Sequence, residues 1–190
     1  MPFMSATSHL IGPERGRLVM RTARQGLAAQ AGHDLTIEIT RWSGEVVVVD
    51  DPADDPPAGS VSGNVTVTVE LGTLRVVAGT GGMLPLSERD KREIARTARD
   101  LLDTDRQPEA RFVCERLADS GVLTGKLTIR GETRPFEMTV TELGGGRYRG
   151  TGTVVQSWYG IKPYIAFLGA LKVADPVEIE AEVDLSGPAA

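Results

Sequence analysis

The segment LTIRGETRPFEMTV, residues 127–140, determines the fold class that we predict for this chain. Apolar residues alternate with polar ones on both sides of a charged turn, at Leu127, Ile129, Phe136, Met138 and Val140. In the turn, residues 130–134, Gly131 supplies the positive φ that a tight hairpin needs, and Pro135 is expected as the first residue of the second strand. The pattern predicts an antiparallel hairpin with one apolar face and one solvated face.

The same period of two residues recurs along most of the chain. It predicts strands at residues 17–23, 33–40, 45–49, 65–71, 74–78, 111–117, 122–129, 135–142, 147–155 and 177–185. We expect the runs 35–39 and 45–49 to pair as a hairpin around the turn Trp42-Ser43-Gly44. Parallel strands need long crossover connections, so a chain with a single helix is expected to form an antiparallel sheet.

One segment has a helical period instead of a strand period. Its apolar residues follow the spacing i, i+4, i+7 and i+8, at Ile94, Ala98, Leu101 and Leu102. Ser87 and Asp90 resemble a capping box, and Pro108 lies beyond the end, which predicts a helix over residues 88–102. Its apolar stripe is narrow, so we expect the helix to lie across a barrel mouth or a sheet edge.

Three other segments are expected to be irregular. Residues 50–63 are rich in proline and aspartate and predict a loop, and the glycines at 144–146 predict a turn. Residues 156–176 hold four of the nine aromatic residues without clean alternation. A loop this apolar is rarely left in water.

Composition limits the possible functions of the chain. A length of 190 residues, with 25% charged and 41% hydrophobic residues, is typical of one globular domain. The net charge of −5 offers no attraction to nucleic acid or to an anionic membrane. With Cys114 as the one cysteine and two histidines, neither a disulfide framework nor a zinc site is expected. No signal peptide or membrane-spanning run is visible, so we expect a soluble, cytoplasmic protein.

Patterns that suggest specific chemistry each have a simpler explanation. The glycines at 79, 81 and 82 precede a helix, but Pro85 separates them from its start, so a flexible connection is favoured over a phosphate site. His33 and Asp34 are adjacent on a strand and point to opposite faces, which disfavours a catalytic pair. Cys114 lies within a strand, with no local helix terminus to activate its thiol.

Calcium binding is also a weak reading of the acidic loop. Its aspartates at 50, 51, 54 and 55 lack the alternate-position spacing and the terminal glutamate of a calcium loop. We favour a solvated acidic loop. The remaining signal is the strand alternation itself, because eight antiparallel strands that close into a barrel enclose either packed side chains or one small ligand.

The order of these motifs resembles the YceI-like family. The resemblance rests on the hairpin at 127–140, the preceding LLDTDRQPEARFVCERL, the closing VEIEAEVDL, the first-half stretches AGHDLTIEITRWSGEVVVVD and VTVTVEL, and the helix at 88–102. It implies an all-β fold: an eight-stranded antiparallel lipocalin-like β-barrel with one amphipathic α-helix. Residues 17–185 would form this domain, after an N-terminal lead, 1–16, and before a short tail, 186–190.

The resemblance also implies a function without catalysis. The barrel would bind, transport or store a long apolar ligand, a polyisoprenoid or similar lipid, without a cofactor, and the protein would often be a homodimer. The residues expected to contact the ligand are Leu35, Ile37, Ile39, Val65, Val67, Val69, Phe136, Met138, Val140, His33, Trp158 and Tyr159. Arg134 and Tyr164 join His33 and Tyr159 as candidates for contact with a polar head group.

Two other hypotheses remain open from the sequence. A barrel with a filled interior could act through its surface in a stress response, if residues 158–171 fold inward and plug it. An enzyme acting on an apolar substrate would require His33 to lie beside another polar group inside the cavity.

Overall fold

The computed structural model describes residues 5–50, 62–115, 117 and 121–187. In chain order, the strands are β1 (Ser5–Ile11), β2 (Gly16–Thr22), β3 (Arg24–Gln25), β4 (Asp34–Ile39), β5 (Trp42–Asp50), β6 (Ser62–Glu70), β7 (Leu74–Thr80), β8 (Glu109–Cys114), β9 (Val122–Ile129), β10 (Glu132–Gly144), β11 (Arg147–Val155), β12 (Ile165–Ala166), β13 (Leu171–Val173) and β14 (Pro176–Asp184). The helices are α1 (Glu88–Leu102) and the short 3₁₀ turns η1 (Ala29–Ala31), η2 (Leu71–Thr73), η3 (Gln156–Tyr159) and η4 (Phe167–Gly169). Most of the predicted loop at 50–63 lies outside the described residues.

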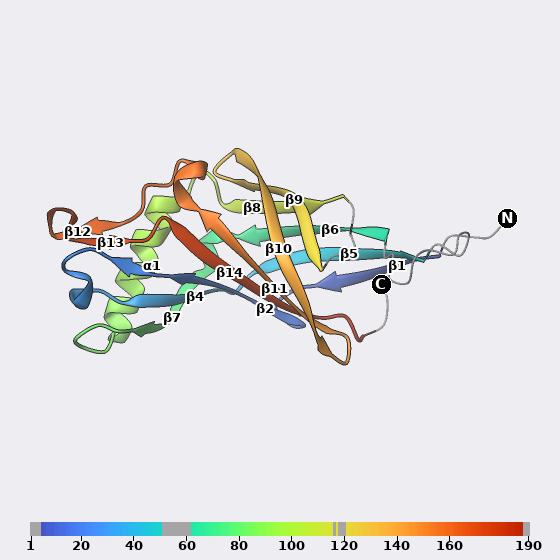
Figure 1. The fold of residues 1–190 in the computed structure, drawn as a ribbon, viewed down its shortest axis with the longest axis horizontal. Coiled ribbons are helices and arrows are strands. Elements are labelled where there is room, and N and C mark those ends of the chain that lie inside the picture. The colour runs from blue at the N-terminus through green and yellow to red at the C-terminus, as the bar shows by residue number, and fades with distance from the viewer. Residues whose placement is uncertain (1–4, 51–61, 116, 118–120, 188–190) are drawn as a thin grey trace.

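The principal sheet contains eleven antiparallel strands in the described chain, so the predicted count of eight is wrong. Their order is β1-β5-β6-β8-β9-β10-β11-β14-β2-β4-β7, and the sheet is curled (Figure 1). The ten predicted strands are all present. The eleventh, β1, comes from residues 5–11 of the expected lead. The sequence of β1 alternates only weakly between apolar and polar residues. Its position in the sheet comes from main-chain pairing with β5.

The hairpin at 127–140 is confirmed, with a shorter turn than the sequence predicts. Arg130 and Gly131 alone form the turn, with φ of 52° and 77°, which is the pattern of a type I′ hairpin. Strand β10 therefore begins at Glu132, and Pro135 is its fourth residue instead of its first. Pro135 pairs with Lys126 of β9, while the pairing of β10 with β11 begins only at Thr139.

The predicted hairpin between residues 35–39 and 45–49 is wrong. Strand β4 pairs with β2 and β7, whereas β5 pairs with β1 and β6. Trp42-Ser43-Gly44 belongs to β5 and is not a turn, because the Trp42 ring is buried against Gly16. The chain bends instead at residues 40–41. Alternation located both strands but could not identify their partners.

A second bend, at η2, lies against the first. The Thr73 hydroxyl donates to the Glu70 carbonyl at 2.8 Å and accepts from the Arg41 amide at 3.1 Å. The Thr40 hydroxyl donates to the Thr73 carbonyl at 3.1 Å. Since β4 and β7 belong to one end of the sheet order and β5 and β6 to the other, this paired corner holds the two ends together here, although the edge strands β1 and β7 do not pair with each other in the described residues.

The helix is confirmed at the predicted residues. Ser87 accepts from the Asp90 amide at 3.2 Å, and the Asp90 carboxylate accepts from the Ser87 amide at 2.9 Å, which completes the predicted capping box. Helix α1 packs against β7, the last strand of the sheet order, and lies across one end of the molecule (Figure 1). A narrow apolar stripe suffices there because the helix covers a single edge.

The interior is filled along the middle of the curled sheet. Phe112 and Phe136 meet edge to face, with ring centroids 5.8 Å apart and planes at 81°. Val65 and Cys114 are buried beside them on paired positions of β6 and β8. This part of the curled sheet encloses packed core.

The outer face of β2, β4 and β7 carries a network of ion pairs. Glu38 of β4 accepts from Arg17 at 3.1 Å on one side and from Arg75 at 2.6 Å on the other. Hydrogen bonds from Arg75, and secondarily from Arg17, lower the pKa of the Glu38 carboxyl against the opposing effect of partial burial. Beneath these side chains Val19 is only 1% exposed, although it lies on the outer face beside Glu38.

Replacing Thr73 with valine should destabilise the corner. Thr73→Val keeps the side-chain shape but removes both hydroxyl hydrogen bonds, so we expect a loss of about 1–3 kcal/mol in the free energy of unfolding. Urea unfolding measures it. Thr139→Val, on the exposed face of β10, is the control and should change stability by less than about 0.5 kcal/mol. Equal effects of the two substitutions would contradict the role of the corner.

Acid should remove the stabilisation that Glu38 provides. Because the folded pKa is lowered, the contribution is complete above the unfolded pKa of about 4.3 and is lost as the pH falls through the folded value. Glu38→Gln should therefore cost about 1 kcal/mol near neutral pH, and the difference from wild type should vanish in acid. Unfolding at a series of pH values measures this. Glu142→Gln, an exposed carboxyl of β10, is the matched control.

Candidate functional site

A cavity of about 560 Å³ lies between helix α1 and the inner face of the sheet. The helix contributes one wall, strands β2, β4 and β14 a second, and β13 with the connection before α1 a third. The apolar residues that line it are Met20, Ala31, Leu35, Ile37, Leu71, Leu84, Pro85, Leu86, Ile94, Ala98, Leu101, Leu102, Ile129, Val154, Ile161, Leu171, Val173, Val177 and Ile179. The packed core therefore gives way to a hollow at the helix end.

Strand register explains why the sheet wall is apolar. Met20 of β2 pairs with Ile179 of β14 on one side and with Ile37 of β4 on the other, so the three side chains form one row across the strands. All three line the cavity. Opposite this row, Ile94 and Ala98 of α1 face the cavity from the apolar stripe that the sequence predicts.

The cavity opens to solvent where its lining residues are themselves exposed. Leu84 is 75% exposed and Tyr164 is 43% exposed, yet both contribute to the lining. Polar side chains also line the cavity, at Thr22, Arg24, His33, Asp90, Glu93, Thr97, Gln156, Tyr164 and Lys172. The site can therefore surround an apolar chain and offer hydrogen-bond partners to a polar end.

The connection from β7 to α1 passes close over two of these polar residues. A Cβ added at Gly82 would overlap the His33 ring, and one added at Gly81, whose φ is 84°, would overlap the Arg24 guanidinium. The glycines thus permit close approach to side chains. Flexibility or phosphate binding is not needed to explain them.

His33 is fixed by a hydrogen bond to the backbone. Its Nε2 lies 2.7 Å from the Leu84 carbonyl oxygen, and since a carbonyl can only accept, Nε2 carries the hydrogen. Asp34 instead accepts from the Arg24 amide at 2.8 Å. The two neighbours have different partners and do not form a catalytic pair.

The structure brings three of the twelve predicted contact residues to the cavity. All twelve lie in the described part of the chain, and His33, Leu35 and Ile37 line the hollow. The other nine lie elsewhere, in the packed core, half-buried along the sheet or at the surface: Ile39, Val65, Val67, Val69, Phe136, Met138, Val140, Trp158 and Tyr159. Alternation identifies the inner face but does not show where along it side chains leave space.

The head-group candidates divide in the same way. Tyr164 lines the cavity together with His33. Tyr159 is 2% exposed in the core, where burial raises the pKa of its phenol. Arg134 forms an ion pair with Glu132 at 3.0 Å on the hairpin. The sequence reasoning missed the lining residues of β2, β13 and β14, and it recognised the helix stripe only as a cover.

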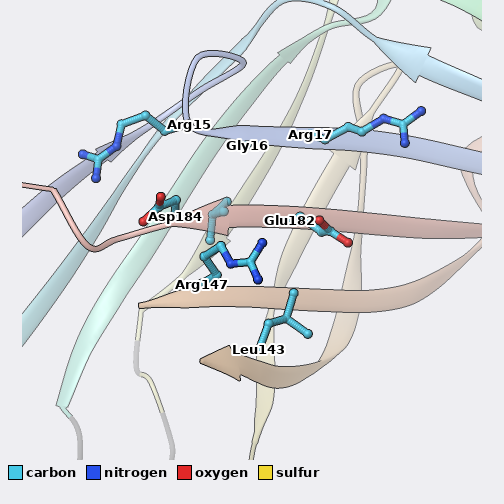
Figure 2. A pocket seen from close by; sticks show the side chains of 8 residues that line it. Arg15, Gly16, Arg17, Leu143, Arg147, Glu182 and Asp184 are labelled. Atoms are coloured by element: carbon cyan, nitrogen blue, oxygen red, sulfur yellow. The ribbon is translucent and has the colours of Figure 1, made fainter. Parts of the chain in front are cut away.

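A second, smaller hollow of about 140 Å³ lies at the end of the sheet away from the helix (Figures 1 and 2). Figure 2 shows Arg15, Arg17 and Arg147 there, together with Glu182 and Asp184. Hydrogen bonds from Ser186, and then the charges of Arg15 and Arg147, lower the pKa of Asp184. The hollow therefore holds charges of both signs, and two of its residues pair with neighbours outside it, Arg17 with Glu38 and Glu182 with Arg149.

The described residues do not contain the group of side chains that a metal site needs. They contain no cluster of three or more histidine, cysteine, aspartate or glutamate side chains that could hold an ion. The calcium alternative falls mainly on aspartates outside the described residues. Cys114 is fully buried in β8.

Comparison with models of known protein families assigns the chain to one of them. A sequence model described as the YceI-like domain matches residues 18–185. The chain belongs to the YceI-like family. Proteins of this family are known for binding polyisoprenoids and are generally not enzymes. The cavity of this YceI-like chain is lined mainly by apolar residues.

Comparisons with curated proteins and with solved structures add no further assignment. No curated protein matches the YceI-like chain. Among solved structures, a crystal structure of a mutant CJ YceI protein with a monobromobimane guest shares 14% identity, covers 66% of this chain and 70% of its own, and has a TM-score of 0.43.

In the described residues, α1 is too short and too polar to cross a membrane, and no other helix could do so.

Adding a methyl group at Gly82 should disturb the cavity mouth. Gly82→Ala would displace the His33 ring and break its bond to Leu84, so we expect a loss of about 1 kcal/mol in stability. Thermal unfolding and the His33 ring resonances measure it. Gly72→Ala is the control, because a Cβ there meets nothing within 4 Å. Unchanged His33 resonances in Gly82→Ala would contradict the contact.

Proposed function

We propose that this YceI-like protein binds one long apolar molecule, a polyisoprenoid or similar lipid, in the cavity beneath α1 and carries or stores it without chemical change. The observation that carries the proposal is the cavity of about 560 Å³, whose walls are mainly aliphatic. Its volume lies within the range of about 300–1,000 Å³ that is usual for small-molecule sites.

Burial of apolar surface provides the binding energy. Each methylene group that leaves water contributes about 0.8 kcal/mol to binding. A chain of ten carbons would therefore contribute about 8 kcal/mol, before the entropic cost of ordering the ligand and the site is subtracted. The walls supply the matching surface from both α1 and the sheet. A ligand longer than the cavity would extend outward through the mouth, past Leu84 and Tyr164.

Polar residues along the lining would orient the ligand. Tyr164 offers a phenol and Lys172 offers a positive charge, while the ring of His33, whose N–H is donated to the Leu84 carbonyl, lies beside them in the lining. A molecule with one polar end would place that end among them and its apolar part against α1. His33 already binds the Leu84 carbonyl, which supports a positioning role over proton transfer.

Filling the cavity should weaken binding. Ala98→Phe adds a ring to the helix wall, so we expect roughly tenfold weaker binding of geranylgeraniol, measured by displacement of the fluorescent probe N-phenyl-1-naphthylamine. Val173→Phe fills the same space from β13 and should act alike. The matched control is Ala78→Phe, an exposed position on β7 outside the cavity, which should bind as wild type.

Native mass spectrometry of the purified full-length chain, followed by organic extraction, tests the proposal directly. A mass above that of the polypeptide, released by extraction, supports it. A homogeneous apo mass combined with no binding of geranylgeraniol would overturn it and leave a barrel that acts through its surface. Weak binding by Ala78→Phe equal to that of Ala98→Phe would also contradict the assigned cavity.

A further inference from the structure

Large apolar side chains gather around the mouth of the cavity. Of the nine that are strongly exposed in the described residues, seven lie on three segments, 26–31, 80–86 and 163–171. We define the apolar rim as the six that project furthest from these segments: Leu27, Met83, Leu84, Ile165, Phe167 and Leu168. Their exposed fractions run from 61% to 109%. Such concentration is not the scattered exposure of an ordinary surface.

Direct contacts hold the three segments together. The Ala28 amide donates to the Ala170 carbonyl at 2.8 Å, which joins the first segment to the third. The His33 ring, just after η1, donates to the Leu84 carbonyl of the second segment. Figure 1 shows the three loops at the same end of the molecule, where η1, β12, β13 and the β7–α1 connection meet. The rim is therefore one built surface.

The backbone presents two rim residues in an unfavourable conformation. Phe167 and Leu168 have φ of 51° and 54°, in the left-handed region that bulky side chains rarely occupy. Their side chains are nevertheless 65% and 109% exposed, so intramolecular packing does not offset the strain. A strained backbone together with exposed apolar side chains indicates that this surface contacts a lipid phase or another molecule.

The distribution of charged residues in the three segments indicates what kind of partner contacts the rim. The three segments together contain 22 residues and no Asp, Glu, Lys or Arg, although a quarter of the whole chain is charged. Lys162 precedes the third segment and can extend toward lipid head groups. Protein interfaces have polar rims, whereas the interior of a bilayer excludes charge from all inserted tips.

We propose that the apolar rim docks the protein onto a neutral lipid bilayer by inserting these side chains below the head groups. Insertion places the cavity mouth, to which Leu84 contributes, against the lipid phase. An apolar molecule could then pass between bilayer and cavity without crossing water. Docking depends on the rim and does not require an occupied cavity, so it extends beyond the proposed ligand binding.

Sedimentation with vesicles of phosphatidylcholine tests the docking. The wild-type chain should bind, and its binding should be insensitive to salt because the tips carry no charge. The double substitution Phe167→Asn with Leu168→Asn should weaken partitioning roughly tenfold or more, since two apolar side chains are lost while asparagine tolerates the left-handed backbone. The control Leu10→Asn, an exposed leucine on β1, should bind as wild type.

Other outcomes overturn the docking. No binding by wild type, equal binding by the double variant, or binding only to anionic vesicles and only at low salt would each do so. Light scattering that shows a dimer disrupted by the same double substitution would assign the rim to a second copy instead. Ala98→Phe leaves the rim unchanged and should still bind vesicles, so failure of ligand binding and failure of docking give different results.

Discussion

The Thr73 hydroxyl ties together the two corners of the chain that join the ends of the sheet. It accepts from the Arg41 amide and donates to the Glu70 carbonyl, so the β4–β5 and β6–β7 connections bend at one place. A row of eleven antiparallel strands would otherwise remain an open sheet with an exposed apolar face. Because the chain bends at this corner, the apolar face of the curled sheet lies on its inner side, and side chains fill that interior only in part.

Side chains fill the middle of this interior but not its helix end. The two phenylalanines that meet between β8 and β10 close the middle, while aliphatic side chains surround the hollow beneath α1. The helix has two roles there, because its stripe covers the edge strand β7 and also forms a cavity wall. A narrow stripe is sufficient for both, since the opposite face of the helix remains in water.

Charge and apolar surface are separated along the molecule. Ion pairs such as those of Glu38 lie on the outer face of the strands, where they shield Val19 from solvent. The hollow at the far end also holds charges of both signs (Figure 2). Around the cavity mouth, in contrast, three segments carry none. The uncharged surface is confined to these loops, since helix α1 at the same end of the molecule carries nine charged residues.

The sequence by itself determined the elements that depend on local physics. Alternation located ten strands, the Ser87–Asp90 capping box set the start of the helix, and Gly131 marked the hairpin turn. The sequence also identified β9 and β10 as neighbours, but the partners of β4 and β5 were decided only by the tertiary structure, because their pairing depends on distant main-chain groups. The tertiary structure also decided where the interior is hollow: Ile37 and Phe136 are both buried apolar residues in alternating strands, but only Ile37 lines the cavity. Empty space is a property of packing among segments remote in the chain, and no local pattern records it.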